Sequence, residues 1–102
     1  MIYSEYTTKV QQGKVDEYLS MLPKFLPLYQ KYGIKFVGAW KPIESQDEAV
    51  WMTGFENQQR RTEQLAKLKQ DPEYQKLSQQ VRTLIIQNTT RTLNPAPGSP
   101  LK

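Results

Sequence analysis

The sequence contains neither cysteine nor histidine. Without cysteine the chain can form no disulfide, has no thiol nucleophile and cannot build a zinc site from thiolates. Without histidine it lacks the usual general base near neutral pH, the commonest metal ligand and the usual axial ligand of haem. A catalytic Ser-His-Asp or Cys-His arrangement is therefore excluded within this chain, and we expect no metal and no cofactor.

Long apolar runs are also missing. No stretch approaches the ~20 apolar residues that are needed to span a bilayer. The first residues, Ile2 to Tyr6, already have the pattern of a strand, which leaves no room for the basic and apolar regions of a signal peptide. The sequence therefore predicts no membrane span and a cytoplasmic location.

Charge of one sign does not gather in blocks, although the 102 residues carry a formal net charge of +4. The basic side chains between Arg60 and Arg82 alternate with Glu63, Asp71 and Glu73. Interspersed charge of this kind is typical of a solvated surface. We therefore predict no nucleic-acid partner.

The strongest periodic signal lies between residues 14 and 32, where apolar side chains recur at helical spacing. Gly33 is a good stop for this helix, because glycine tolerates the left-handed conformation. Pro23 and Pro27 lie inside the pattern, and each lacks an N–H and crowds the carbonyl four residues earlier. The helix is therefore expected to kink or restart near Leu22.

Two further helix starts are marked by capping residues. Asn57 is a plausible N-cap for a polar helix that runs to about residue 70. Asp71 followed by Pro72 marks a second start, since aspartate caps well and proline suits the first helical position. Alternation and content of β-branched and aromatic residues predict strands at residues 2–8, 34–41, 48–55 and 84–93.

This order of elements predicts an α+β fold of the ferredoxin-like kind, βαββαβ, with an antiparallel four-stranded sheet and helices on one face. Residues 1–93 form that domain in this interpretation. Residues 94–102 are rich in proline and cannot continue a central strand, so we expect an extended C-terminal tail.

The second and third predicted strands carry apolar residues on both of their alternating faces. Phe36 and Trp40 are expected on one face and Val37 on the other, and Met52 alternates with Trp51 in the same way. Helices in a chain of this length can cover only one face of the sheet. The sequence therefore predicts a homodimer through the opposite sheet face, and leaves open whether the face with Trp51 or the face with Met52 meets the partner.

Several motifs, in a consistent order, support a family resemblance. They are the Phe-Val-Gly-Ala-Trp sequence at 36–40, Arg61, the Asp-Pro-Glu-Tyr turn at 71–74 and the proline-rich ending at 93–100. With these motifs the chain resembles the NIPSNAP family, within the wider group of dimeric α+β barrel proteins. The resemblance implies a dimer whose two sheets pack face to face, and it implies no agreed enzymatic activity.

Three positions depart from the pattern of that family. Tyr6 stands where arginine is expected on the first strand, Thr53 where the third strand usually has tryptophan, and Gly98 where the tail usually has phenylalanine. These changes bear on the preference for a ligand and not on the fold.

Aromatic residues are the main candidates for a binding site. Trp40, Trp51 and Phe55 can line an apolar pocket between sheet and helices, and the plainer alternative is that they belong to the core or to the dimer interface. Tyr6 and Tyr29 can supply a phenolic acid or orient a ligand. The plainer alternative is that both are ordinary half-buried tyrosines with no role at a site.

One charged pair is also a candidate. Glu56 ends the third predicted strand and Arg61 lies one turn into the next helix, so the two can form an anion clamp or a buried pair. A surface salt bridge is the plainer interpretation and contributes only about 0 to 1 kcal/mol to stability.

The function predicted from these observations is that of a small homodimeric protein that binds a small apolar ligand or another protein. The alternative is a cofactor-free monooxygenase or isomerase that acts on an aromatic or polyketide-like substrate, and its support is an analogy of fold. An RNA-binding sheet is a third alternative, but the predicted third strand begins with Asp47 and Glu48 and lacks the basic and aromatic motif of such sheets.

Overall fold

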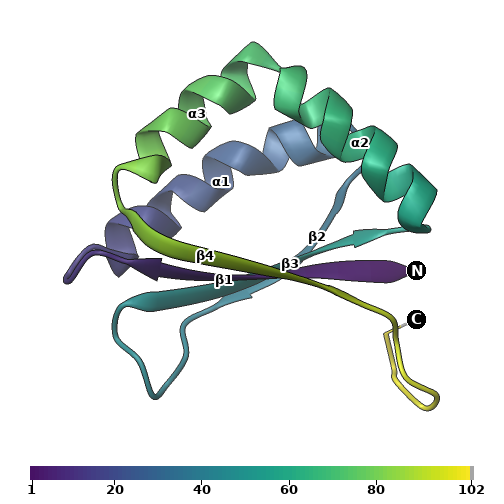
Figure 1. The fold of residues 1–102 in the computed structure, drawn as a ribbon, viewed down its shortest axis with the longest axis horizontal. Coiled ribbons are helices and arrows are strands. Elements are labelled where there is room, and N and C mark those ends of the chain that lie inside the picture. The colour runs from purple at the N-terminus through teal and green to yellow at the C-terminus, as the bar shows by residue number, and fades with distance from the viewer. Residues whose placement is uncertain (102) are drawn as a thin grey trace.

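The computed structural model describes residues 1–101 and contains four strands and three helices (Figure 1). In chain order they are β1 (Ile2–Val10), α1 (Val15–Lys31), β2 (Lys35–Trp40), β3 (Glu48–Phe55), α2 (Gln58–Gln70), α3 (Pro72–Arg82) and β4 (Ile85–Leu93). The predicted α+β class and the order βαββαβ are confirmed, with the second helical region divided in two.

The sheet is antiparallel and has the strand order β2-β3-β1-β4. β1 pairs with both β3 and β4 and so lies in the interior of the sheet. All three helices lie over one face, with α2 and α3 forming an angled pair above it, and the C-terminal segment descends on the other side (Figure 1). The sheet therefore has one covered face and one open face.

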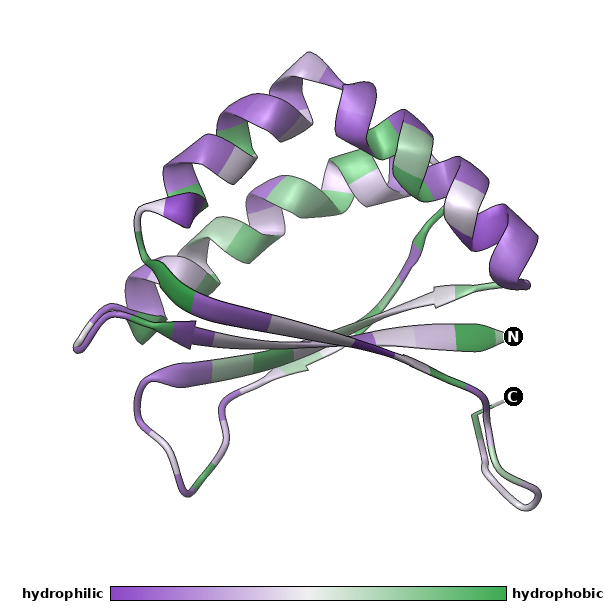
Figure 2. Cartoon of the chain, viewed as in Figure 1, coloured by the Kyte–Doolittle hydropathy of each residue, from purple (hydrophilic) through white to green (hydrophobic). Residues whose placement is uncertain are grey.

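Helix α1 supplies most of the core against the sheet. Figure 2 shows that α1 carries more hydrophobic residues than α2 and α3, which are largely hydrophilic. Its buried residues recur every three or four positions, as the sequence predicts, and pack on the covered face. They are Val15, Tyr18, Leu22, Phe25, Leu28 and Tyr29.

The expected break in this helix does not occur. α1 runs without interruption from Val15 to Lys31 through Pro23 and Pro27. The two prolines are four residues apart, so they share one side of the helix, and both are exposed to solvent. The carbonyls that lose their intrahelical N–H partner therefore face water, which can hydrogen-bond to them in its place.

The predicted helix caps are confirmed. The Asn57 side chain accepts a hydrogen bond of 2.8 Å from the amide of Arg60, and the Asp71 carboxylate accepts from the amides of Glu73 at 2.9 Å and Tyr74 at 3.3 Å. These caps satisfy amides that have no partner within the helix. The Asn57 cap fixes the start of α2, and the Asp71 cap fixes the corner between α2 and α3.

A β-bulge in β2 reverses one predicted side-chain direction. Phe36 pairs with Thr53, but after the bulge Trp40 pairs with Val50, so Trp40 lies on the open face of the sheet. The expectation that Phe36 and Trp40 share a face is therefore wrong, because the extra residue shifts the alternation by one. Trp51 lies on the covered face and Met52 on the open face.

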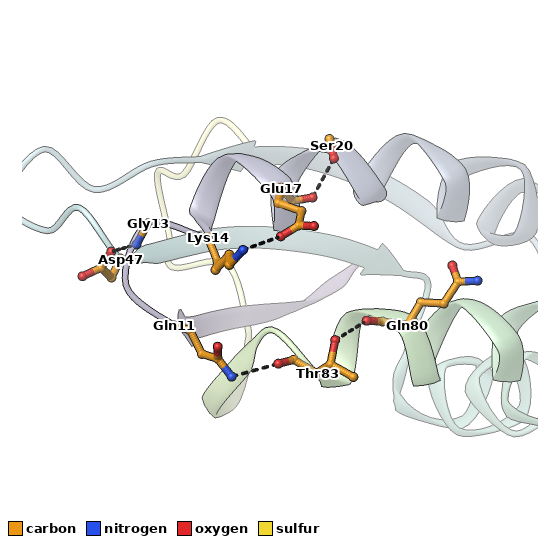
Figure 3. Close-up of polar contacts among 8 residues, drawn as sticks. All are labelled: Gln11, Gly13, Lys14, Glu17, Ser20, Asp47, Gln80 and Thr83. Carbon is orange, nitrogen blue, oxygen red and sulfur yellow. Dashed lines mark hydrogen bonds and ion pairs between the residues drawn. The ribbon is translucent and has the colours of Figure 1, made fainter.

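One end of the sheet is tied together by polar contacts in the turn after β1 (Figure 3). The amide of Gly13 donates to the Asp47 carboxylate at 3.2 Å, and Gln11 Nε2 donates to the carbonyl of Thr83 at 2.9 Å. The φ of Gly13 is +76°, a conformation that favours glycine. These contacts join the start of α1 to the β2–β3 loop and to the end of α3.

After β4 the described residues form no further helix or strand, and a turn brings the amide of Ser99 within 3.0 Å of the carbonyl of Ala96. Over residues 1–101, none of the helices combines the length and the apolar character that crossing a membrane requires.

Candidate functional site

A cleft lies between the covered face of the sheet and the helices. Its larger part has a volume of about 630 Å³ and is bounded by α1, α3 and the sheet. A second part of about 360 Å³ extends toward α2. Volumes in this range suit small organic ligands. The residues that line both parts are Tyr29, Trp51, Lys69, Tyr74 and Asn88.

Stacked aromatic rings form the floor of the cleft. The rings of Tyr6 and Trp51 lie parallel on the sheet, with centroids 4.0 Å apart and 17° between their planes. Tyr29 reaches down from α1 to within 6.1 Å of Trp51, measured between ring centroids. Three of the predicted site residues are therefore brought together in one aromatic cluster that lines the cleft.

The indole of Trp51 is held in place by a hydrogen-bond chain. Trp51 Nε1 donates to the hydroxyl of Tyr18 at 3.1 Å, and that hydroxyl lies 3.4 Å from Thr8 Oγ1. Thr8 in turn donates to the side-chain oxygen of Asn88 at 3.0 Å. The chain links β3, α1, β1 and β4, and it fixes the ring without using the face that borders the cleft.

Two phenols at the site, Tyr18 and Tyr29, have a raised pKa. Burial raises the pKa of Tyr29 far above its ordinary value, and burial also raises the pKa of Tyr18. A phenol with a raised pKa can donate a hydrogen bond but is a poor general base near neutral pH. The cleft is therefore suited to holding a ligand more than to removing a proton from it.

Arg61 closes the end of the cleft under α2. Its Nε donates to the hydroxyl of Ser4 at 2.8 Å, and its guanidinium carbon lies 5.9 Å from the ring centroid of Phe55. Within residues 1–101 Arg61 forms no ion pair, with Glu56 or with any other acid. The expected pair with Glu56 is therefore wrong: Glu56 precedes α2 and points to solvent, while Arg61 is drawn inward to the sheet.

Two other predicted site residues lie outside the cleft. Phe55 is 2% exposed and belongs to the core beneath Arg61. Trp40 is 49% exposed on the open face, where its ring lies close over Gly38. The β-bulge in β2 accounts for the position of Trp40.

Thr53 is a polar residue of the cleft that the sequence did not mark as part of the site. It is 1% exposed and lines the smaller part of the cleft, and its hydroxyl has no hydrogen-bond partner in the described part of the chain. The sequence holds two signals: Thr53 departs from the tryptophan usual in the family that the sequence resembles, and it lies two residues after Trp51, which puts both on the same face of a strand.

Lys69, Tyr74 and Asn88 were also missed as lining residues. They come from α2, α3 and β4, and only the folded arrangement brings them together. Among residues 1–101 no cluster of three or more His, Cys, Asp or Glu side chains could hold a metal ion. The chemistry available at the site is therefore that of aromatic surfaces, neutral hydroxyls and cations.

Solved structures with the same fold cover nearly the whole chain. A NIPSNAP family protein of unknown function from Agrobacterium tumefaciens is 25% identical, with a TM-score of 0.90, over 100% of this chain and 94% of that one. An uncharacterized NIPSNAP domain protein from Burkholderia xenovorans is 22% identical, with a TM-score of 0.88, over 98% of this chain and 99% of that one. No curated protein sequence matches this one.

A more distant structure shares the fold. It is SnoaB, a cofactor-independent oxygenase from Streptomyces nogalater, which is 12% identical with a TM-score of 0.74, over 97% of this chain and 96% of that one. The family model for NIPSNAP matches residues 3–100, a span that runs from β1 past β4 and includes every side chain of the cleft. With this match, the chain belongs to the NIPSNAP family.

Proposed function

We propose that this protein is a binding module that holds one small, flat, largely apolar molecule in the cleft between sheet and helices. The observation that carries the proposal is the stacked pair of Tyr6 and Trp51 on the floor of the cleft, with Tyr29 beside it. Aromatic walls of this kind bind ring-containing ligands through apolar burial and offset stacking. The hydrogen bond from Trp51 to Tyr18 presets the floor before a ligand arrives.

The proposal includes a homodimer formed through the open face of the sheet. Trp40 is half exposed there, and Val50 and Met52 lie on the same face in neighbouring register positions. A partly apolar face without helices is suited to contact with a second copy of itself. We also propose a cytoplasmic location, as the sequence predicts.

A cofactor-free oxygenase is the competing function, and the fold shared with SnoaB is what favours it. The cleft supports that function less well. Its titratable lining groups are tyrosines, Lys69, Arg61 and Arg82, and burial moves the pKa of Tyr18 and Tyr29 away from the neutral range. Proton removal from a substrate would have to rely on one of these groups.

Isothermal titration calorimetry of the full chain with 2-naphthol tests the proposal. 2-Naphthol is flat, apolar and neutral, and we expect one molecule to bind per chain. Ser78→Leu adds bulk to the wall that α3 contributes to the cleft and should weaken binding by about tenfold or more.

Gln80→Leu is the matched control, because residue 80 is an exposed position of the same helix outside the cleft lining. It should leave the affinity for 2-naphthol unchanged. Equal affinities for the two variants and the natural chain, or no binding at all, would contradict a ligand site in this cleft.

A further inference from the structure

The end of the cleft under α2 carries an arginine that is positioned but only partly used. A guanidinium has five N–H donors. In the described part of the chain Arg61 donates a hydrogen bond only through its Nε, to Ser4. The contact with the Phe55 ring holds the planar group over the sheet. The two terminal nitrogens therefore remain available to an acceptor inside the cleft, which Arg61 lines.

Thr53 stands beside this arginine. It is the register partner of Ser4 across the β1–β3 ladder, so the side chains of the two residues lie next to each other on the covered face. The Thr53 hydroxyl is buried and is the one side-chain polar atom of residues 1–101 that is both buried and without a hydrogen-bond partner. A hydroxyl in that position is expected to have a partner, since buried polar groups are paired in most proteins.

Charge in the cleft has one sign. Lys69 lines both parts of the cleft and Arg82 lines the larger part, while the lining includes no aspartate or glutamate in either part. Tyr29, a buried phenol there, stays neutral because burial raises its pKa. A negatively charged ligand therefore meets attraction and no acidic repulsion along the cleft.

We propose that the natural ligand is an aromatic carboxylate, whose ring system packs against the Tyr6–Trp51 stack and whose carboxylate accepts hydrogen bonds from Arg61 and Thr53. This inference rests on the proposed function and adds the chemical class of the ligand. A planar carboxylate matches the fork of a guanidinium, and a threonine hydroxyl beside it can donate to one of the same two oxygens. One half-buried arginine balances the single negative charge of such a group.

The test compares 2-naphthoate with 2-naphthamide by isothermal titration calorimetry of the full chain. The two probes have nearly the same shape and differ in charge. We expect the natural chain to bind 2-naphthoate about tenfold or more tightly than 2-naphthamide. Arg61→Gln should remove this preference while leaving the affinity for 2-naphthamide nearly unchanged.

Arg60→Gln is the matched control. Arg60 is exposed, precedes Arg61 in the same helix and contacts Glu63 at 3.8 Å, so its loss removes an equal charge without touching the cleft. The preference for 2-naphthoate should survive in this variant. Thr53→Val is nearly isosteric and should weaken 2-naphthoate several-fold with no loss of folding, which circular dichroism checks.

Three outcomes would contradict the carboxylate inference, and they show whether the proposed function fails with it. Equal affinity of the natural chain for the acid and the amide would overturn the carboxylate inference and leave the proposed function in place. Retention of the preference in Arg61→Gln would overturn it as well. Failure of both probes to bind the natural chain would overturn the proposed function and, with it, this inference.

Discussion

Trp51 on β3 donates through its indole nitrogen to the hydroxyl of Tyr18 on α1, at 3.1 Å. This contact joins the floor of the cleft to α1, the helix that contributes the largest share of the buried core residues. The Tyr18 hydroxyl also lies 3.4 Å from Thr8 Oγ1, which has Asn88 as a second partner. The relationship explains how an aromatic residue that lines the cleft is held in one orientation.

Tyr18→Phe tests how much the hydroxyl of Tyr18 contributes to the stability of the fold. The substitution leaves the ring in the core and removes the acceptor of the Trp51 N–H, so the free energy of unfolding should fall by about 1 to 3 kcal/mol. Urea denaturation measures it. Tyr74→Phe is the comparison for the loss of one tyrosine hydroxyl, because the Tyr74 hydroxyl has no hydrogen-bond partner in the described part of the chain and its ring contact with Phe25 is kept. Unchanged stability in Tyr18→Phe would show that the hydrogen-bond chain contributes nothing.

Asp71 combines two roles at the corner between α2 and α3. It caps α3, and its carboxylate also accepts from the hydroxyl of Tyr32 at 2.5 Å and from Lys31 Nζ at 3.0 Å. Asn57→Ala removes a simple cap and should cost about 0.5 to 2 kcal/mol in the free energy of unfolding. Asp71→Ala should cost more than Asn57→Ala, because it also removes the acceptor of two side chains from α1. Urea denaturation measures both costs. An equal or smaller cost for Asp71→Ala would show that the contacts of Asp71 with Tyr32 and Lys31 add nothing to the cap.

The same carboxylate predicts a dependence of stability on pH. The hydrogen bonds from Tyr32 and Lys31 hold the pKa of Asp71 well below its ordinary value. The unfolded chain then binds a proton more readily, so this stabilisation is present above the unfolded pKa of about 4 and is lost as pH falls below it.

Asp71→Asn keeps an oxygen for the cap and removes the charge. The difference in unfolding free energy between the natural chain and this variant should be constant from about pH 5 to 7 and should shrink below about pH 4. Thermal and urea denaturation across that range measure it. A difference that is the same at pH 3 and pH 7 would show that the charge of Asp71 does not stabilise the fold.

The proposed dimer predicts different effects for the two faces of β3. Met52→Asp places a charge on the open face and should give a folded monomer, whereas Trp51→Asp buries an unpaired charge among the helices and should unfold the chain. Light scattering and circular dichroism together distinguish these results. Ile43→Asp is the control, since Ile43 is 97% exposed in the β2–β3 loop and should leave the mass of the dimer unchanged. A natural chain that is monomeric at micromolar concentration would contradict the proposed dimer.

Much of the fold follows from local signals in the sequence. Asn57 and Asp71 carry the capping chemistry that starts a helix, and Gly33 adopts the left-handed φ of +72° that ends one. These features act within a few residues, so they can be recognised without knowledge of the tertiary structure. The order of strands and helices then restricts the topology to few alternatives.

Two predictions, the face of Trp40 and the break in α1, are wrong because tertiary structure overrides a local rule. Alternation assumes a regular ladder, and the bulge between Phe36 and Gly38 moved Trp40 to the other face of the sheet. Pro23 and Pro27 weaken a helix in isolation, but the buried face of α1 holds the helix together, and the unpaired carbonyls are directed to solvent.

The site was predictable only in part. Tyr6, Tyr29 and Trp51 were candidates because large aromatic residues dominate apolar surfaces, and the fold brings them together. The role of Thr53 depends on which groups surround its hydroxyl, and Lys69 reaches the cleft only through the angle between helix and sheet. Neither property is encoded in the identity or spacing of neighbouring residues.

The most direct test of the account is a crystal structure of the full chain in complex with 2-naphthoate, at a concentration that saturates the calorimetric titration. The account predicts density for the ring system against Trp51 and Tyr6, with the carboxylate within hydrogen-bond distance of Arg61. Density for 2-naphthoate on the open face of the sheet, with none between the sheet and the helices, would contradict the central claim that this cleft is the ligand site.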